Sequence, residues 1–141
     1  MSVLQGDVYL DKPWLSVRWD SEYECIYAEY KVFSNSSAFR MGAMTILDAI
    51  RERHAKAVVS DNRRLTGISD ADKLWVPEFW VPLAAAAGME RLAVVAAYTE
   101  QDKIAIGAAV SHFGPKTFIT RIFDSPDEAL TWIVSSENEV E

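Results

Sequence analysis

Short apolar runs that alternate with helical stretches constrain the fold of this chain more than any other feature. The runs at residues 57–59, 92–96 and 117–123 have the pattern of strands buried in a parallel sheet. A segment with helical spacing follows each of the first two, and Ser125 with Pro126 is a strong helix start after the third. This alternation predicts an α/β domain with a mostly parallel sheet and right-handed crossovers.

The sheet is expected to begin with an antiparallel hairpin. Apolar and polar residues alternate over residues 15–19 and 26–32, and the polar turn at residues 20–22 joins them. A further short strand is expected at residues 8–10. Apolar residues then recur at helical spacing, which predicts an amphipathic helix over residues 36–54, so about four helices cover the sheet in all.

The helix expected over residues 69–88 carries two prolines in its interior. Pro77 and Pro82 each remove one backbone donor and clash with the carbonyl group four residues back, so we expect a kink or a break near one of them. The helix expected over residues 104–113 is apolar on nearly all sides, which is typical of a buried helix. Together these helices exceed what one face of a small sheet can cover, so we expect a homodimer that buries at least ~1,200 Å² in total.

Composition and charge narrow the class of function. The chain of 141 residues has the size of one domain, and its formal net charge of −7 argues against nucleic acid as a partner. Cys25 is the only cysteine, which excludes an intrachain disulfide and favours a packing role. The longest apolar run, residues 81–89, is shorter than the ~20 residues of a membrane span, and the N-terminus lacks a signal pattern. We therefore expect a cytoplasmic protein without a membrane span.

The order of elements resembles the STAS-like fold of stage II sporulation protein AA and other anti-sigma-factor antagonists, in particular a branch of small stand-alone bacterial proteins. The resemblance rests on VVSDNRRL at residues 58–65, Trp75 and Trp80-Val81-Pro82, residues 87–94, and residues 123–132. It implies one STAS-like domain over residues 15–134, after an N-terminal extension or short strand at residues 1–14 and before an acidic tail at residues 135–141.

The same resemblance implies a regulatory role through protein contacts. In the switch-type members a phosphorylatable Ser begins the helix after the central strand. The comparable segment here is residues 66–70, which makes Ser69 the phosphorylation candidate, although the usual Asp-Ser-Ser-Gly-like turn is absent.

Polar residues at the end of the strand at residues 57–59 form the first candidate binding site. Asp61, Asn62 and Arg63 lie where open α/β sheets usually bind ligands. Arg63 and Asn62 could hold an anionic or polar group. Alternatively, they brace the loop, with Arg63 paired to Asp61 or to a nearby carboxylate such as Asp70 or Asp72. We favour bracing slightly.

Three aromatic residues form the second candidate site. Trp75 and Phe79 share one face of the expected helix, whereas Trp80 points in another direction. One face can pack on the sheet as core, and the excess aromatic surface is expected to meet a partner or a ligand.

The sequence shows no arrangement typical of catalysis. It has two histidines, His54 and His112, both expected near helix ends, and no metal-ligand spacing, nucleophile motif, phosphate loop or dinucleotide loop. We therefore expect no catalytic residue, no metal and no cofactor. The leading hypothesis is a non-enzymatic regulatory or protein-interaction module with a regulatory protein partner. The alternative is a carrier of an apolar small molecule or lipid in a pocket beside the Trp/Pro-rich helix.

Overall fold

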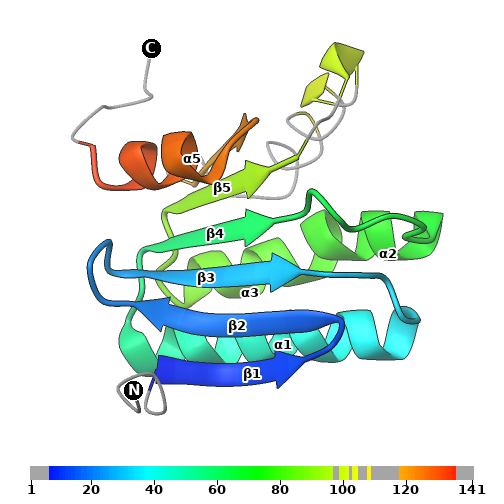
Figure 1. The fold of residues 1–141 in the computed structure, drawn as a ribbon, viewed down its shortest axis with the longest axis horizontal. Coiled ribbons are helices and arrows are strands. Elements are labelled where there is room, and N and C mark those ends of the chain that lie inside the picture. Colours follow the sequence, from blue (N-terminus) through cyan, green and yellow to red (C-terminus); the bar gives the residue numbers. More distant parts are fainter. Residues whose placement is uncertain (1–6, 97–98, 102, 105–107, 109–117, 136–141) are drawn as a thin grey trace.

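A computed structural model of the chain describes residues 7–96, 99–101, 103–104, 108 and 118–135 (Figure 1). Its centre is a six-stranded sheet in the order β1-β2-β3-β4-β5-β6. The strands are β1 (Val8–Lys12), β2 (Leu15–Asp20), β3 (Cys25–Tyr30), β4 (Ala57–Asp61), β5 (Arg91–Val95) and β6 (Ile119–Phe123). The pairs β1–β2 and β2–β3 are antiparallel, and the other three pairs are parallel. The predicted α/β class and the predicted hairpin at the start of the sheet are confirmed.

The helices begin and end at recognisable local signals. Helix α1 (Ser36–Arg53) starts after Asn35, whose side chain accepts a hydrogen bond from the Ala38 N–H at 2.8 Å. It ends at His54, which adopts a left-handed conformation with φ of 53°. Helix α5 (Pro126–Ile133) starts after Ser125, whose hydroxyl accepts from the Glu128 N–H. Both starts agree with the predictions.

The helices divide between the two faces of the sheet. Because the parallel strands follow one another in a single direction, right-handed crossovers place α1 and the run from α2 (Asp70–Trp75) to α3 (Val81–Ala86) on the same face. Helix α5, which follows the last strand, packs on the opposite face over β4, β5 and β6 (Figure 1). Strands β3 to β6 contribute to both cores, since successive side chains point to opposite faces, whereas β1 and β2 contribute only to the core on the side of α1.

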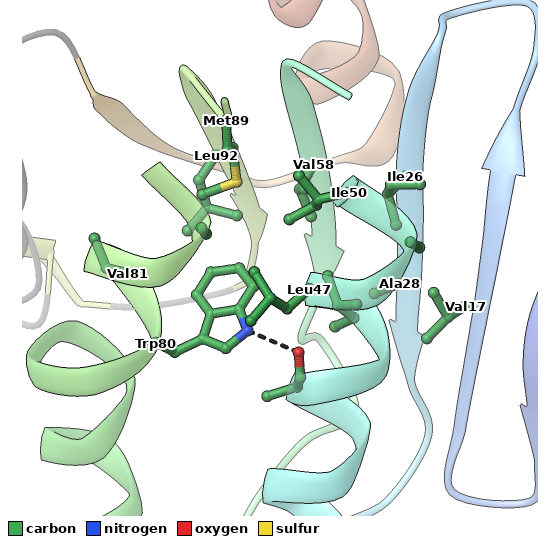
Figure 2. Packing of buried hydrophobic residues seen from close by; sticks show 14 of the residues in the cluster. Val17, Ile26, Ala28, Leu47, Ile50, Val58, Trp80, Val81, Met89 and Leu92 are labelled. Carbon is green, nitrogen blue, oxygen red and sulfur yellow. Dashed lines mark hydrogen bonds between the residues drawn. The ribbon is translucent and has the colours of Figure 1, made fainter. Parts of the chain in front are cut away.

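The larger core lies between the sheet and the helices α1 and α3. Trp80 fills its centre with 4% of its surface exposed, and its indole N–H donates a hydrogen bond to the Ala43 carbonyl at 2.7 Å. Figure 2 shows this indole between the two helices, with Leu47 of α1 beside it and Val81 on the same helical run. Because its indole N–H has a hydrogen-bond partner, Trp80 can fill the core without leaving a buried polar group unpaired.

The helical run after β4 does not break at its prolines. It continues as α2, a π-helical segment η2 (Val76–Trp80) and α3, and each proline lies near the start of a segment. The Val81 N–H bonds to the carbonyl of Val76, five residues back, and Pro82 follows without a donor of its own. The expected break is therefore absent, and the backbone accommodates the prolines through one wide turn inside a continuous helix. The helix expected over residues 104–113 lies almost wholly outside the described residues.

At Gly42, α1 packs against β2 with no room for a side chain. A Cβ atom at this position would collide with the Cδ2 of Leu15, which is itself completely buried. Overpacking a core of this density typically costs about 1–3 kcal/mol, against a gain of about 1 kcal/mol in helix propensity. We expect Gly42→Ala to lower the free energy of unfolding by about 1 kcal/mol, as measured by urea denaturation.

A double-mutant cycle isolates the contact behind this expectation. In a Leu15→Val background the colliding Cδ2 atom is absent, so Gly42→Ala should then be neutral or stabilising. Equal losses in both backgrounds would contradict the steric explanation.

Candidate functional site

The strand-end residues Asp61 and Arg63 form a closed ion pair. Asp61 is the last residue of β4 and is 3% exposed. The Arg63 Nε and Nη2 atoms donate to its two carboxylate oxygens at 2.9 and 2.8 Å, and the Tyr27 hydroxyl donates to Oδ2 at 3.2 Å. Of the three carboxylates considered from the sequence, Arg63 thus pairs with Asp61 and not with Asp70 or Asp72. This bidentate geometry supports the bracing interpretation.

Asn62 is also occupied by contacts within the protein. Its N–H donates to the Val95 carbonyl at 2.8 Å, which extends the pairing of β4 and β5 by one residue. Its carbonyl accepts from the Leu65 N–H at 3.1 Å, and its side-chain oxygen accepts from the Ser60 hydroxyl at 2.7 Å. These bonds fix the loop after β4 and engage the backbone and the side-chain oxygen of Asn62 within the protein.

The charges at this strand end are held in one protonation state near neutral pH. Burial alone would raise the pKa of Asp61, but the hydrogen bonds from Arg63 and Tyr27 outweigh it and hold the pKa below 3.8. Burial, followed by the nearby Asp61 charge, raises the pKa of Tyr27 to about 12. Asp61 therefore stays a carboxylate acceptor and Tyr27 stays a hydroxyl donor.

The bracing role gives a direct test. Arg63→Ala leaves the buried Asp61 carboxylate with the Tyr27 hydroxyl and one backbone N–H. Because 47% of the Arg63 side chain is exposed, water screens the pair, and we expect a loss of only about 1 kcal/mol. Thermal melting should show this loss, while Arg64→Ala, an exposed neighbour, should melt like the wild type. A variant that melts normally but loses a partner in a pull-down would contradict bracing.

A second polar cluster ties the start of α1 to the start of α2. Asp72 is completely buried, and its carboxylate accepts from the Ser36 hydroxyl at 2.6 Å, Arg40 Nε at 2.7 Å and the Ser69 hydroxyl at 3.0 Å. Burial alone would raise the pKa of Asp72, but these three donors outweigh it and lower the pKa below 3.8. The Asp72 carboxylate therefore links the N-terminal ends of α1 and α2 through hydrogen bonds.

Ser69, the phosphorylation candidate, belongs to this cluster. Its hydroxyl accepts from the Asp72 N–H at 3.1 Å as the N-cap of α2 and donates to the Asp72 carboxylate. The hydroxyl is therefore engaged both as acceptor and as donor. A phosphoryl group attached to it would meet the buried carboxylate, so like charges would oppose each other.

A partly exposed aromatic stack lies next to the polar cluster. The rings of Trp75 and Phe79 stack with centroids 5.3 Å apart, and the Arg40 guanidinium lies over the Trp75 ring at 5.0 Å. Leu74 is 54% exposed and Phe79 is 48% exposed. We name the set Arg40, Leu74, Trp75 and Phe79 the aromatic surface.

The three predicted aromatic site residues thus separate into two groups. Trp75 and Phe79 stack on each other, as their predicted common face requires, with Phe79 exposed and Trp75 half-buried against the core. Trp80 lies in the core and fills the space between α1 and α3 (Figure 2). The strand-end pair of Asp61 and Arg63 is part of neither group.

Sequence reasoning missed Ser36, Arg40 and Tyr27 as members of these sites. Ser36 and Arg40 are four residues apart at the start of α1, so they share one helix face. That spacing was the available signal, but it does not name Asp72, which lies more than 30 residues further along the chain. Tyr27 had no local signal beyond its place in a strand.

Comparisons with known proteins bear on the fold. No known protein family matches the sequence, and no curated protein matches it either. A crystal structure matches across 84% of this chain and 91% of its own, with a TM-score of 0.57. It is described as an uncharacterised protein of the DUF3478 family, with a SpoIIAA-like fold, from Shewanella loihica PV-4. This chain has a SpoIIAA-like fold.

The resemblance to the STAS-like fold drawn from the sequence is thereby confirmed at the level of architecture. Sequence identity to the Shewanella loihica protein is 14%, so the likeness concerns the fold and not the function. Within the described part of the chain, no helix has the length and apolar character needed to cross a membrane. The same residues contain no group of three or more His, Cys, Asp or Glu side chains suited to a metal ion.

Proposed function

We propose that this chain is a non-enzymatic regulatory module that acts through protein contacts, and that the aromatic surface is its contact site. The observation that carries the proposal is the ordered Arg40–Trp75–Phe79 stack, in which Phe79 is 48% exposed while Trp75 is half-buried against the core. Trp and Arg are the residues most enriched among those that dominate binding energy at protein interfaces.

The stack is also preorganised for binding. Arg40 is held by its 2.7 Å bond to Asp72, so its guanidinium does not move freely over the Trp75 ring. A side chain that is already ordered loses less conformational entropy when a partner binds. Since the Asp72 charge compensates that of Arg40, the stack offers an apolar surface with little net charge.

The alternative function, transport of an apolar small molecule, has less support. The Trp80 side chain occupies the space beside the helical run where such a ligand would lie, and it is anchored to the Ala43 carbonyl. The strand end is an equally weak candidate for ligand binding, because Asp61 and Arg63 satisfy each other.

Photo-crosslinking tests the proposal. A photoreactive phenylalanine analogue replaces Phe79, and the matched control carries it at Val8, which is similarly exposed at 40% on β1. In the producing cells we expect covalent protein adducts from position 79 and none from position 8. Equal adduct yields at both positions, or none at either, would contradict the proposed contact site.

A further inference from the structure

We infer that the aromatic surface binds a second copy of this chain, in a two-fold symmetric dimer formed by the α2–η2 run. The inference rests on the proposed function and names its partner. Leu74 and Phe79 supply the apolar centre, about half of each side chain being exposed. A partner that binds this surface must itself be apolar at the centre of its contact face and must carry complementary charges at the rim.

The charges around this centre favour a copy of the same surface. Lys73 and Glu78 are exposed, carry opposite charges, and lie on either side of Leu74 along the helical run. In a two-fold pair of antiparallel helices, each Lys73 would face Glu78 of the partner subunit. The surface is thus complementary to itself, whereas a strongly acidic or strongly basic partner would meet one like charge.

Both rim charges are also free to pair. Among the residues that the structure describes, neither Lys73 nor Glu78 makes an ion pair, although several other surface charges do. In a symmetric dimer, Lys73 and Glu78 of each subunit would pair with the opposite charges of the other subunit, which gives two equivalent ion pairs. Leu74 and Trp75 then lie near the two-fold axis, where the most strongly contributing residues of an interface usually cluster.

Charge reversal of the purified full chain tests the inference. Sedimentation velocity should show a dimer for the wild type at high micromolar concentration. Lys73→Glu or Glu78→Lys alone places like charges opposite each other twice per dimer, so each should raise the dimer Kd about tenfold or more. The double variant Lys73→Glu/Glu78→Lys restores opposite charges and should recover most of the lost affinity.

Two further variants serve as controls. Phe79→Ser should raise the dimer Kd about a hundredfold or more, and at concentrations low enough for both proteins to be monomers it should melt like the wild type, because this side chain is exposed. Lys12→Glu, the same charge change on β1, should leave the Kd unchanged. A wild-type monomer at high micromolar concentration would overturn the inference, and so would a double variant as weak as the single variants. In either case, adducts to another protein from position 79 would leave the proposed function standing.

Discussion

Trp80→Ala should lower the free energy of unfolding by about 3–5 kcal/mol, the cost typical of removing a large buried aromatic side chain. The indole is 4% exposed and lies between α1 and α3 (Figure 2), so its removal leaves a cavity that two helices must collapse to close. It also removes the hydrogen bond to the Ala43 carbonyl. Urea denaturation followed by circular dichroism measures the loss.

The neighbouring residue provides a matched control for this prediction. Phe79 adjoins Trp80 in the chain but is 48% exposed, so Phe79→Ala should cost less than about 1 kcal/mol. Trp80→Phe should fall between the two, because it keeps part of the packing but not the N–H donor. Similar losses for Phe79→Ala and Trp80→Ala would contradict the placement of these two rings.

Asp72→Ala should lower the free energy of unfolding by about 2 kcal/mol, because it removes a buried carboxylate that accepts three hydrogen bonds, although the exposed donors Ser36 and Ser69 can turn to water. The Ser36 hydroxyl, the Arg40 guanidinium and the Ser69 hydroxyl all donate to this one carboxylate. Arg40 is 39% exposed and can turn partly to water, so the loss should stay below that of a fully buried ion pair. Asp70→Ala, an exposed change in the same helical turn, should cost less than about 1 kcal/mol.

The pH dependence of stability provides a second readout for Asp72. A carboxyl group whose pKa is lower in the folded than in the unfolded protein stabilises the fold above its unfolded value, here 3.8. That stabilisation is lost as the pH falls from this value through the folded pKa. Asp72→Asn removes the group, so the variant should lose less stability than the wild type between about pH 5 and pH 2. Parallel curves would show that Asp72 is not preferentially ionised in the folded state.

Local sequence signals predicted most of the elements but not their contacts. The bounds of α1, the hairpin of β2 and β3, and the Ser125 cap follow from periodicity and from capping chemistry within a few residues. The separation of Trp75 and Phe79 from Trp80 likewise follows from helical geometry. The π-helical segment could not be predicted, since a proline specifies a missing donor but not the way in which the backbone accommodates it.

The partners of the charged residues were the least predictable part of the site. Arg63 had three candidate carboxylates nearby in sequence, and only the folded loop selects Asp61. Asp72 binds Arg40 across 32 residues, and Tyr27 binds Asp61 across 34. Pairs at such separations depend on the register of strands and on the packing of helices, neither of which a single sequence records.

The strictly sequential order of the six strands has a consequence for how the chain folds. Every strand pairs with the strand that precedes it, so no pairing must wait for a distant part of the chain to arrive. This arrangement keeps contact order low for a parallel sheet and limits the loop-closure entropy of each step. The sheet can therefore grow from its antiparallel end, where β1, β2 and β3 are joined by short turns, and each later strand adds to an edge that already exists.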